Sequence, residues 1–309
     1  MGYLRIIRWP NLLIMAMVMG CLRFFLVLPQ FHHAGIIEGS SIMLFILLVA
    51  GVISIAAGGY VINDVFDIEI DAVNHRDSQI VGNEISIEAA RKFYLIVSSI
   101  GILIGFYLAY LVSNFNFGLI FPVMAALLYY YSKRYKRQVI SGNIVVAFAS
   151  AMVLVVAWNF EILMLNADNE QLANDHGLIP FISRFVYAYT FFAFFSTLIR
   201  EIVKDVEDIE GDSASGCLTL PVLAGVSASK KILSVLVLLL MTFVAYWQYW
   251  LWVKGYIYGS GFLFLTQFVG IVTLVKLFSR KRPINWHLMS NLMKVLMVSG
   301  IASIVLLNF

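Results

Sequence analysis

Two acidic segments contain the residues whose types and spacing could do chemistry. Residues Asn63–Asp71 read NDVFDIEID, and residues Lys204–Asp212 read KDVEDIEGD. Each segment follows a long apolar run, in a chain of which only 13% of residues are charged. Carboxylates beside apolar segments are costly to desolvate unless they bind a partner. We therefore expect the two segments to bind a ligand, and to face each other across one site.

Helical spacing groups the side chains of each segment on one face. Asn63, Asp67 and Asp71 lie four residues apart, and residues at this spacing are neighbours on a helix surface. Like charges at these positions repel each other, so a bound divalent cation would stabilise the arrangement. The corresponding residues of the second segment are Asp205, Asp208 and Asp212. The alternative explanation is that both segments are solvated helix ends at the membrane surface and bind nothing. Two segments with similar spacing make this alternative less favoured than a single segment would.

The ligand types favour a hard cation. Both segments offer carboxylate oxygens, and no cysteine or histidine stands at metal-ligand spacing near them. Mg²⁺ binds through one or two carboxylates and completes its shell with water and substrate phosphates. The sequence therefore predicts a Mg²⁺–diphosphate site. The predicted metal ligands are Asn63, Asp64, Asp67, Asp71, Asp205, Asp208 and Asp212.

Basic side chains could complete a phosphate site. Lys204 lies one helical turn before Asp208. Lys136 and Arg137 end a basic run, SKRYKR, which could also be a plain membrane anchor. Arg23 lies deep in the first apolar run, where an arginine is costly unless it is buried against partners. We expect Arg23 to face the interior of a helix bundle, with a role in substrate binding as an open alternative.

Composition places these residues in a membrane protein. Hydrophobic residues make up 61% of the 309 residues, above the roughly 45–50% of soluble domains. Apolar runs long enough to cross a bilayer recur about nine times. We predict an all-α, polytopic transmembrane bundle in one integral-membrane domain, residues 1–309. The expected spans are Leu12–Leu28, Ser41–Ile62, Tyr94–Val112, Phe117–Tyr131, Asn143–Trp158, Phe181–Ile202, Ile232–Val253, Ser260–Leu277 and Leu288–Leu307.

Basic residues in alternate loops predict the orientation in a plasma or inner membrane. Lys and Arg collect before the first span and after the second, fourth, sixth and eighth, whereas Pro29–Ser40 and Asn159–Pro180 contain none. The bias places the N-terminus on the cytoplasmic side and the C-terminus outside. The second and sixth spans end on the same side, so both acidic segments are expected at one membrane depth, with the active site facing the cytoplasm.

The motifs resemble those of the UbiA superfamily of intramembrane prenyltransferases. NDVFDIEID resembles the NDxxDxxxD motif of that family, and KDVEDIEGD resembles its KDxxDxxGD motif. Lys136 and Arg137, with Gly142 and Asn143, are similar to its KRxxxxGN segment, and RWPN at Arg8–Asn11 is similar to its RPxN start. REIVKDVEDIEGD is most similar to digeranylgeranylglyceryl phosphate synthases and the bacterial proteins grouped with them.

The resemblance implies a bundle around a central cavity capped by the acidic loops. It implies Mg²⁺-dependent transfer of a polyprenyl group, a geranylgeranyl group above all, from its diphosphate to an acceptor. Geranylgeranylglyceryl phosphate is the favoured acceptor. The partners implied are these substrates and membrane lipid, with no nucleic acid and no obligate protein partner. The catalytic role falls on Asp67, Asp71, Asp208 and Asp212, with Asn63 assisting and Asp64 and Asp205 as outer or additional ligands. Substrate binding falls on Lys204, Lys136, Arg137, Arg23 and Asn11.

One loop departs from the family pattern. Members commonly follow the first acidic motif with a segment like NKPxRPIPSGRIS, whereas residues Asn74–Ser86 read NHRDSQIVGNEIS. Ser78 replaces one usual arginine, and Glu84 replaces a second. We expect weaker diphosphate binding unless Arg76 compensates.

Two other functions remain open. A prenyltransferase of this kind could use an aromatic quinone precursor as its acceptor. A cation-coupled transporter could also place acidic residues near helix ends, but it would have polar residues near the midplane of several spans and broken helices. The spans contain few such residues, and the chain has only six prolines.

Overall fold

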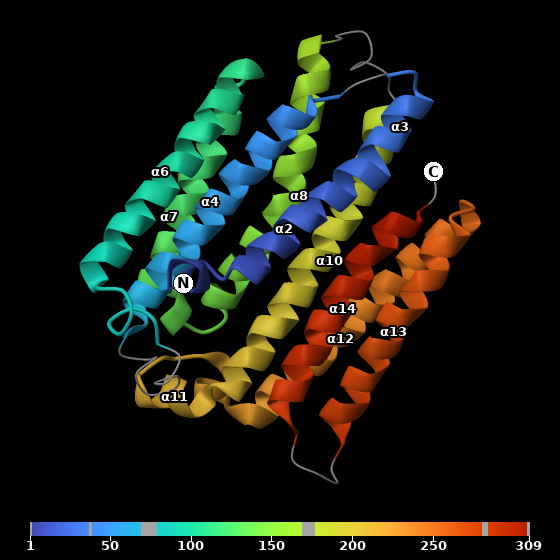
Figure 1. Cartoon of the computed structure of the whole chain (residues 1–309). Helices are drawn as coiled ribbons and strands as arrows, with labels where there is room; N and C mark the ends of the chain where they lie inside the picture. The colour runs from blue at the N-terminus through green and yellow to red at the C-terminus, as the bar shows by residue number, and fades with distance from the viewer. Residues whose placement is uncertain (1, 37–38, 69–78, 169–176, 280–283, 308–309) are drawn as a thin grey trace. The chain divides into compact units, whose positions relative to one another are not determined.

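The computed structural model describes residues 2–36, 39–68, 79–168, 177–279 and 284–307. Within these ranges the regular elements are all helices, and an isolated bridge between Val81 and Ile85 is the sole β-type pairing (Figure 1). The predicted all-α class is confirmed. The helices are α1 (Gly2–Ile6), α2 (Trp9–Leu22), the π-helical η1 (Arg23–Val27), α3 (Leu28–His33), α4 (Ile42–Phe66), α6 (Ile87–Leu111), α7 (Phe115–Lys133), the 3₁₀ helix η2 (Tyr135–Arg137), α8 (Ser141–Asp168), α10 (Leu178–Glu207), α11 (Ile209–Ala214), α12 (Leu220–Val253), α13 (Ile257–Phe278), α14 (Trp286–Ala302) and η3 (Ser303–Leu306).

Among the described residues, nine helical segments are long and apolar enough to span a membrane, which confirms the predicted number. The first of them, Trp9–His33, runs through α2, η1 and α3. Several begin at a side-chain cap. Ser41 Oγ accepts a hydrogen bond from the Leu44 N–H (3.3 Å) at the start of α4. Such caps satisfy backbone donors that have no partner inside the helix.

Two helices extend well beyond the predicted spans. The helix α8 continues to Asp168, so Glu161 lies on a helix and not in a loop. The Glu161 carboxylate is buried and accepts hydrogen bonds from the Ser40 backbone N–H (3.1 Å) and hydroxyl (3.0 Å). The helix α12 begins at Leu220, so Lys230 and Lys231 are helical too. Hydropathy locates the apolar part of a helix, whereas backbone hydrogen bonding continues through polar residues until a cap or a turn ends it.

The described chain divides into two compact units, each assembled from separate stretches of sequence. Unit 1 takes Met1–Gly20, Phe31–Lys136 and Val155–Phe181, and unit 2 takes Cys21–Gln30, Arg137–Leu154 and Ile182–Phe309. The first acidic segment therefore belongs to unit 1 and the second to unit 2. The interpretation of residues 1–309 as one integral-membrane domain stays a prediction.

In unit 1, α4, α6 and α7 pack on one another (Figure 1). Glycines allow the close approach. A Cβ on Gly101 of α6 would lie 3.0 Å from the Gly51 carbonyl oxygen of α4. A Cβ on Gly105 would lie 2.3 Å from the Phe121 ring of α7. Small residues at such crossings are typical of membrane helices, whose association depends on close van der Waals packing.

Replacing Gly105 with alanine should destabilise the protein by about 1–3 kcal/mol, because the rigid Phe121 ring must move to admit the methyl group. Thermal unfolding in detergent measures the effect. Gly261→Ala in α13 is the matched control, since a Cβ there meets no atom within 4 Å. Equal melting temperatures for the two variants would contradict the packing described for α6 and α7.

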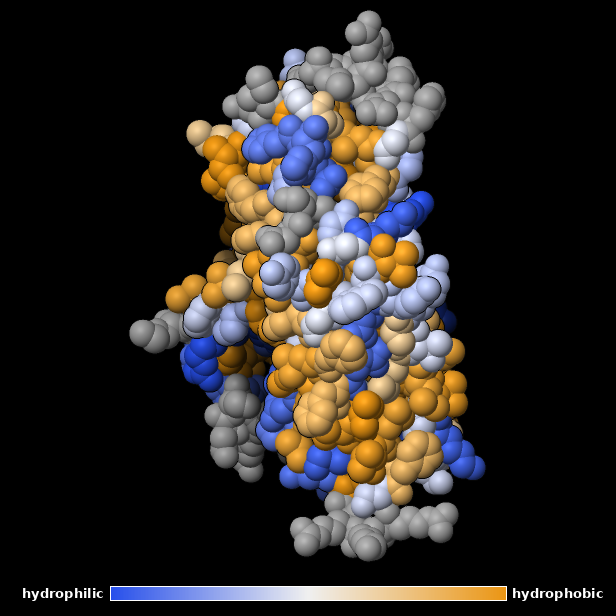
Figure 2. All heavy atoms as spheres, turned by 90° about the vertical axis from the view of Figure 1, so that its right-hand side faces the viewer, coloured by the Kyte–Doolittle hydropathy of each residue, from blue (hydrophilic) through white to orange (hydrophobic). Residues whose placement is uncertain are grey.

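In unit 2, α13 packs against both α12 and α14. Buried hydroxyls pair between helices of this unit: Tyr189 Oη of α10 lies 2.8 Å from Ser303 Oγ of η3, and Thr266 Oγ1 of α13 lies 3.0 Å from Ser299 Oγ of α14. Hydrophobic side chains cover much of the face shown in Figure 2. Large apolar side chains of α13, such as Phe264 and Phe268, are exposed. An exposed apolar surface of this kind is expected where a helix contacts lipid.

Candidate active site

The first acidic segment begins at the end of α4, where the predicted helical spacing holds. Asn63 and Asp67 are both buried, and Asn63 Nδ2 donates a hydrogen bond to Asp67 Oδ2 (2.6 Å). The backbone N–H of Asp67 bonds to the Asn63 carbonyl (3.0 Å), so the last helical turn aligns the two side chains. Asp71, the third predicted residue of this face, lies outside the described residues.

Lys136 pairs with Asp67. Its ammonium group makes an ion pair with Asp67 Oδ2, between residues far apart in the sequence. The Asp67 side chain is almost fully buried, so its charge needs a counter-ion. Lys136 is the predicted cation that the structure brings to the first acidic segment.

Asp64 has a different counter-ion. Arg8 Nη2 lies 3.0 Å from Asp64 Oδ1, and the guanidinium stands over the Tyr60 ring, 5.1 Å from its centroid. Burial lowers the pKa of Arg8, but the Asp64 carboxylate, with Tyr60 and Tyr131, outweighs that effect and raises the pKa above its ordinary value. Arg8 therefore stays positively charged, and the two neighbouring carboxylates are each neutralised by a separate cation.

The oxygen atoms of this segment fit a hard divalent cation. Within the described residues, Asn63 Oδ1 is buried and has no hydrogen-bond partner, although a buried amide oxygen normally has one. It belongs to the side chain that contacts Asp67. The described residues contain no group of three His, Cys, Asp or Glu side chains close enough to hold a metal ion. Asn63 and Asp67 thus offer part of a Mg²⁺ shell, and substrate phosphate and water commonly complete such a shell.

The loop that departs from the family pattern is described from Gln79 onward. Its residues 80–85 form a tight turn, in which the Ile85 N–H bonds to the Ile80 carbonyl (3.1 Å). Glu84, at the position of a usual arginine, makes an ion pair with Arg5. Gln79 Nε2 donates to the Ile68 carbonyl (3.2 Å), which ties the loop to the last described residue of the first acidic segment. Arg76 and Ser78 lie outside the described residues.

The second acidic segment spans the junction of α10 and α11. Asn143 Nδ2, in the first turn of α8, donates to Asp205 Oδ2 (2.7 Å). Asp208 stands between the two helices, and the Asp212 N–H bonds to its carbonyl (3.0 Å). The helical hydrogen-bond pattern therefore continues through the junction, and Asp208 and Asp212 are one turn apart as predicted. Both are partly exposed, whereas Asp205 is held by its amide partner.

The remaining predicted substrate residues lie in different surroundings. Lys204 is on the last turn of α10, and its carbonyl accepts from the Asp208 N–H (2.9 Å). The Arg137 side chain is exposed, while its carbonyl accepts from the Leu218 N–H (3.0 Å). Arg23 is buried in η1, as expected for a cation within a span. Asn11 Nδ2 donates to Tyr60 Oη (3.4 Å), beside the Arg8–Asp64 pair.

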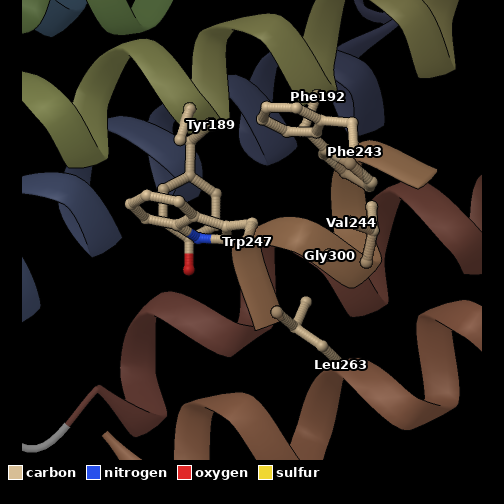
Figure 3. Close-up of a pocket in the computed structure, with 8 residues that line it drawn as sticks. Tyr189, Phe192, Phe243, Val244, Trp247, Leu263 and Gly300 are labelled. Atoms are coloured by element: carbon tan, nitrogen blue, oxygen red, sulfur yellow. The ribbon is translucent and has the colours of Figure 1, made fainter. Parts of the chain in front are cut away.

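A small cavity in unit 2 is not a candidate site. It lies between α10, α12, α13 and α14 and has a volume of about 10 Å³ (Figure 3). Its lining is apolar, and Trp247 lies beside Tyr189 at one end (Figure 3). A space of this size holds about one water molecule, and no ionic side chain lines it. It admits neither a prenyl chain nor a diphosphate.

Residues 11–302 match the UbiA prenyltransferase family, and the acidic residues of both segments lie inside this range. The chain belongs to this family. It is an integral membrane enzyme that transfers prenyl groups. This UbiA protein is 34% identical over 240 residues to digeranylgeranylglyceryl phosphate synthase of Saccharolobus solfataricus. The aligned region covers 78% of this chain and 74% of the relative. The synthase of Sulfolobus acidocaldarius is 36% identical over 208 residues, which is 67% of each chain.

Solved structures have the same fold. A solved structure from work on digeranylgeranylglyceryl phosphate synthase in membranes superimposes with a TM-score of 0.69 at 23% identity. The superposition covers 98% of this chain and 96% of that chain. A UbiA homologue of Archaeoglobus fulgidus bound to DMAPP and Mg²⁺ gives a TM-score of 0.61 at 18% identity, over 98% and 99% of the two chains. Membership of the UbiA family favours the prenyltransferase interpretation over the cation-coupled transporter.

Two polar residues of this UbiA chain were not predicted as site residues. The sequence indicated Arg8 only as a basic residue near the N-terminus and as part of the RWPN motif, whereas the structure shows that it pairs with Asp64. Asn143 was noted only as part of the KRxxxxGN resemblance, yet it holds Asp205. An amide residue directly before an apolar run was the sequence signal for Asn143, which the structure shows to be buried. The partners themselves are contacts between distant segments, which spacing along one helix does not show.

Replacing Lys136 with alanine should raise the KM for the prenyl diphosphate of this UbiA enzyme by about tenfold or more, because a charge-assisted contact to phosphate is lost. Initial rates at saturating acceptor measure the change. Lys133→Ala is the matched control, because Lys133 lies over the Tyr129 ring (5.9 Å), whereas Lys136 pairs with the acidic residue Asp67. An unchanged KM in Lys136→Ala would remove Lys136 from the substrate site.

Proposed function

We propose that this enzyme transfers a geranylgeranyl group from its diphosphate to geranylgeranylglyceryl phosphate, in a reaction that requires Mg²⁺. The observation that carries the proposal is the similarity to digeranylgeranylglyceryl phosphate synthases over more than two thirds of the chain. The Asn63–Asp67 pair, with its buried and unpartnered amide oxygen, supports the metal requirement. So does the Mg²⁺ in the structure of the Archaeoglobus fulgidus homologue.

The chain's own residues have defined roles in this proposal. Asn63, Asp67 and Asp71 bind one part of the metal–diphosphate group, and Asp208 and Asp212 bind another. Bound Mg²⁺ would neutralise the diphosphate and stabilise it as a leaving group. Lys136, Lys204 and Arg137 place positive charge at the departing oxygens. The bond between the prenyl carbon and the diphosphate breaks, the diphosphate keeps the electron pair, and the acceptor hydroxyl oxygen forms the new bond and releases its proton.

The orientation belongs to the same proposal. We place both acidic segments and the N-terminus on the cytoplasmic side and the C-terminus outside, because the basic loops alternate with loops that are poor in Lys and Arg, of which Pro29–Ser40 and Asn159–Pro180 contain none. Impermeant thiol labelling of single cysteines introduced at exposed positions near each terminus tests this orientation. Labelling of the N-terminal cysteine from outside intact cells would overturn it.

The substrates are tested with membranes that contain the protein, Mg²⁺ and radiolabelled prenyl diphosphates of several lengths. Each donor is offered with geranylgeranylglyceryl phosphate and, separately, with an aromatic quinone precursor. The expected product is the glyceryl phosphate lipid with a second geranylgeranyl chain, and its formation should stop with EDTA and resume with added Mg²⁺. Transfer to the aromatic acceptor alone would replace the proposed acceptor, and transfer in the presence of EDTA would reject the metal requirement.

A further inference from the structure

The N-terminal segment Gly2–Arg8 packs on the end of α4 that carries the first acidic segment. Ile6 is fully buried in an apolar cluster with residues of α4 and of the 80–85 turn. Tyr3 packs edge-on against Phe93, with ring centroids 4.9 Å apart. The cluster consists of Ile6, Val61, Ile62, Val65, Val81, Ile85 and Ala90. The segment is therefore fixed by buried apolar contacts, and its charged residues are held in defined positions.

Arg8 contributes a charged contact between this segment and the acidic motif. Its backbone is left-handed, with φ of 52°, at the junction of α1 and α2. A non-glycine residue in this region is strained, so the surrounding contacts must hold it there. Those contacts include the Asp64 carboxylate at 3.0 Å and the Tyr60 ring, whose hydroxyl also accepts from Asn11 Nδ2. A planar guanidinium can pair with a carboxylate while its flat face lies over an aromatic ring, a geometry that an ammonium group does not reproduce.

Asp64 stands next to the predicted metal ligands but has a different environment. Its side chain is only 14% exposed, and it follows Asn63 directly. Asp67 is paired with Lys136, from the turn after α7, whereas Asp64 is paired with Arg8, on the N-terminal segment that the buried Ile6 anchors. Without Arg8, a buried carboxylate would lose its counter-ion beside Asp67. A carboxylate in that state is attracted to any cation bound nearby.

We propose that Arg8 is a positioning residue that keeps Asp64 out of the metal-binding set. By pairing with Asp64, Arg8 leaves Asn63 and Asp67 to bind Mg²⁺ and limits the negative charge that meets the diphosphate. Asp64 is then the anchor of the N-terminal segment and not a ligand. This inference rests on the proposed function, because it assigns a role to residues around that metal–diphosphate site.

The test is a double-mutant cycle on the full-length protein in detergent, with Arg8→Gln, Asp64→Asn and the double variant. Mn²⁺ binding in the presence of inorganic pyrophosphate is measured by electron paramagnetic resonance, and transfer kinetics are measured in parallel. Arg8→Gln should bind Mn²⁺ about threefold or more tightly and lower kcat about tenfold, because the released Asp64 carboxylate becomes a surplus ligand. Asp64→Asn and the double variant should bind Mn²⁺ within about twofold of the wild type.

A general structural defect would weaken Mn²⁺ binding and slow turnover together. Tighter Mn²⁺ binding with slower turnover would therefore not be explained by such a defect. Arg5→Gln is the matched control, since Arg5 is in the same segment but pairs with the exposed Glu84. It should leave the Mn²⁺ affinity unchanged. Arg8→Lys should fall between the wild type and Arg8→Gln, because it keeps the charge and loses the planar contact.

Three results would overturn the inference. One is Mn²⁺ binding that is unchanged or weaker in Arg8→Gln. Another is a double variant that does not return to the Asp64→Asn affinity. The third is an Asp64→Asn variant that loses Mn²⁺ as Asp67→Asn does, which would make Asp64 a ligand. If Arg8→Gln does not fold, as judged by its melting temperature, Asp64→Asn and Arg8→Lys decide the matter by the same criteria. Absence of transfer by the wild type would reject the proposed function alone, because the Mn²⁺ measurement requires no turnover.

Discussion

Replacing Asp67 with asparagine should reduce prenyl transfer by about a thousandfold or more while the protein still folds. The Asp67 carboxylate is almost fully buried, contacts Asn63 and pairs with Lys136. The amide keeps the size and the hydrogen bonding of the side chain but removes the charge that would bind Mg²⁺. Loss of a metal ligand from a reaction that expels diphosphate removes several kcal/mol of transition-state stabilisation, which corresponds to this factor.

The measurement is single-turnover transfer with a radiolabelled donor over a range of Mg²⁺ concentrations. Asp64→Asn is the matched control, because Asp64 lies one helical turn away on α4. It should retain activity within about threefold of the wild type, because the Asp64 carboxylate pairs with Arg8. A melting temperature in detergent shows that both variants fold. Full activity of Asp67→Asn would remove the first acidic segment from the reaction.

Replacing Asp208 with asparagine should have a comparable effect, again about a thousandfold. Asp208 stands at the α10–α11 junction, partly exposed, and Asp212 follows it by one turn. We propose that these two carboxylates bind the metal–diphosphate group together with the first segment. The variant should also lose the Mg²⁺-dependent gain in thermal stability that pyrophosphate produces in the wild type.

Asp205→Asn is the matched control for the second segment. Its carboxylate accepts a hydrogen bond from Asn143 (2.7 Å), which an amide oxygen can also accept. A loss of about tenfold or less is therefore expected, compared with the much larger loss for Asp208. The reverse order, with Asp205 more sensitive than Asp208, would make Asp205 the principal ligand and Asp208 a structural residue.

The class of protein, the number of spans and the two acidic motifs were predictable from local sequence patterns. These features depend on local properties. Apolar runs of sufficient length predict membrane helices, and carboxylates three or four residues apart share a helix face. The helical spacing of Asn63 and Asp67, and that of Asp208 and Asp212, is accordingly as predicted. The lengths of α8 and α12 were underestimated, because polar residues continue a helix that hydropathy alone ends too early.

Which charges neutralise one another follows from the packing of the folded chain and not from local sequence patterns. Lys136 is the partner of Asp67, Arg8 the partner of Asp64, and Asn143 the partner of Asp205. Glu84, which replaces a common arginine of the family pattern, is paired with Arg5. Each pair joins residues more than fifty positions apart. Helical periodicity relates residues within one segment, whereas partners from distant segments depend on how the helices pack and where their connecting turns are held.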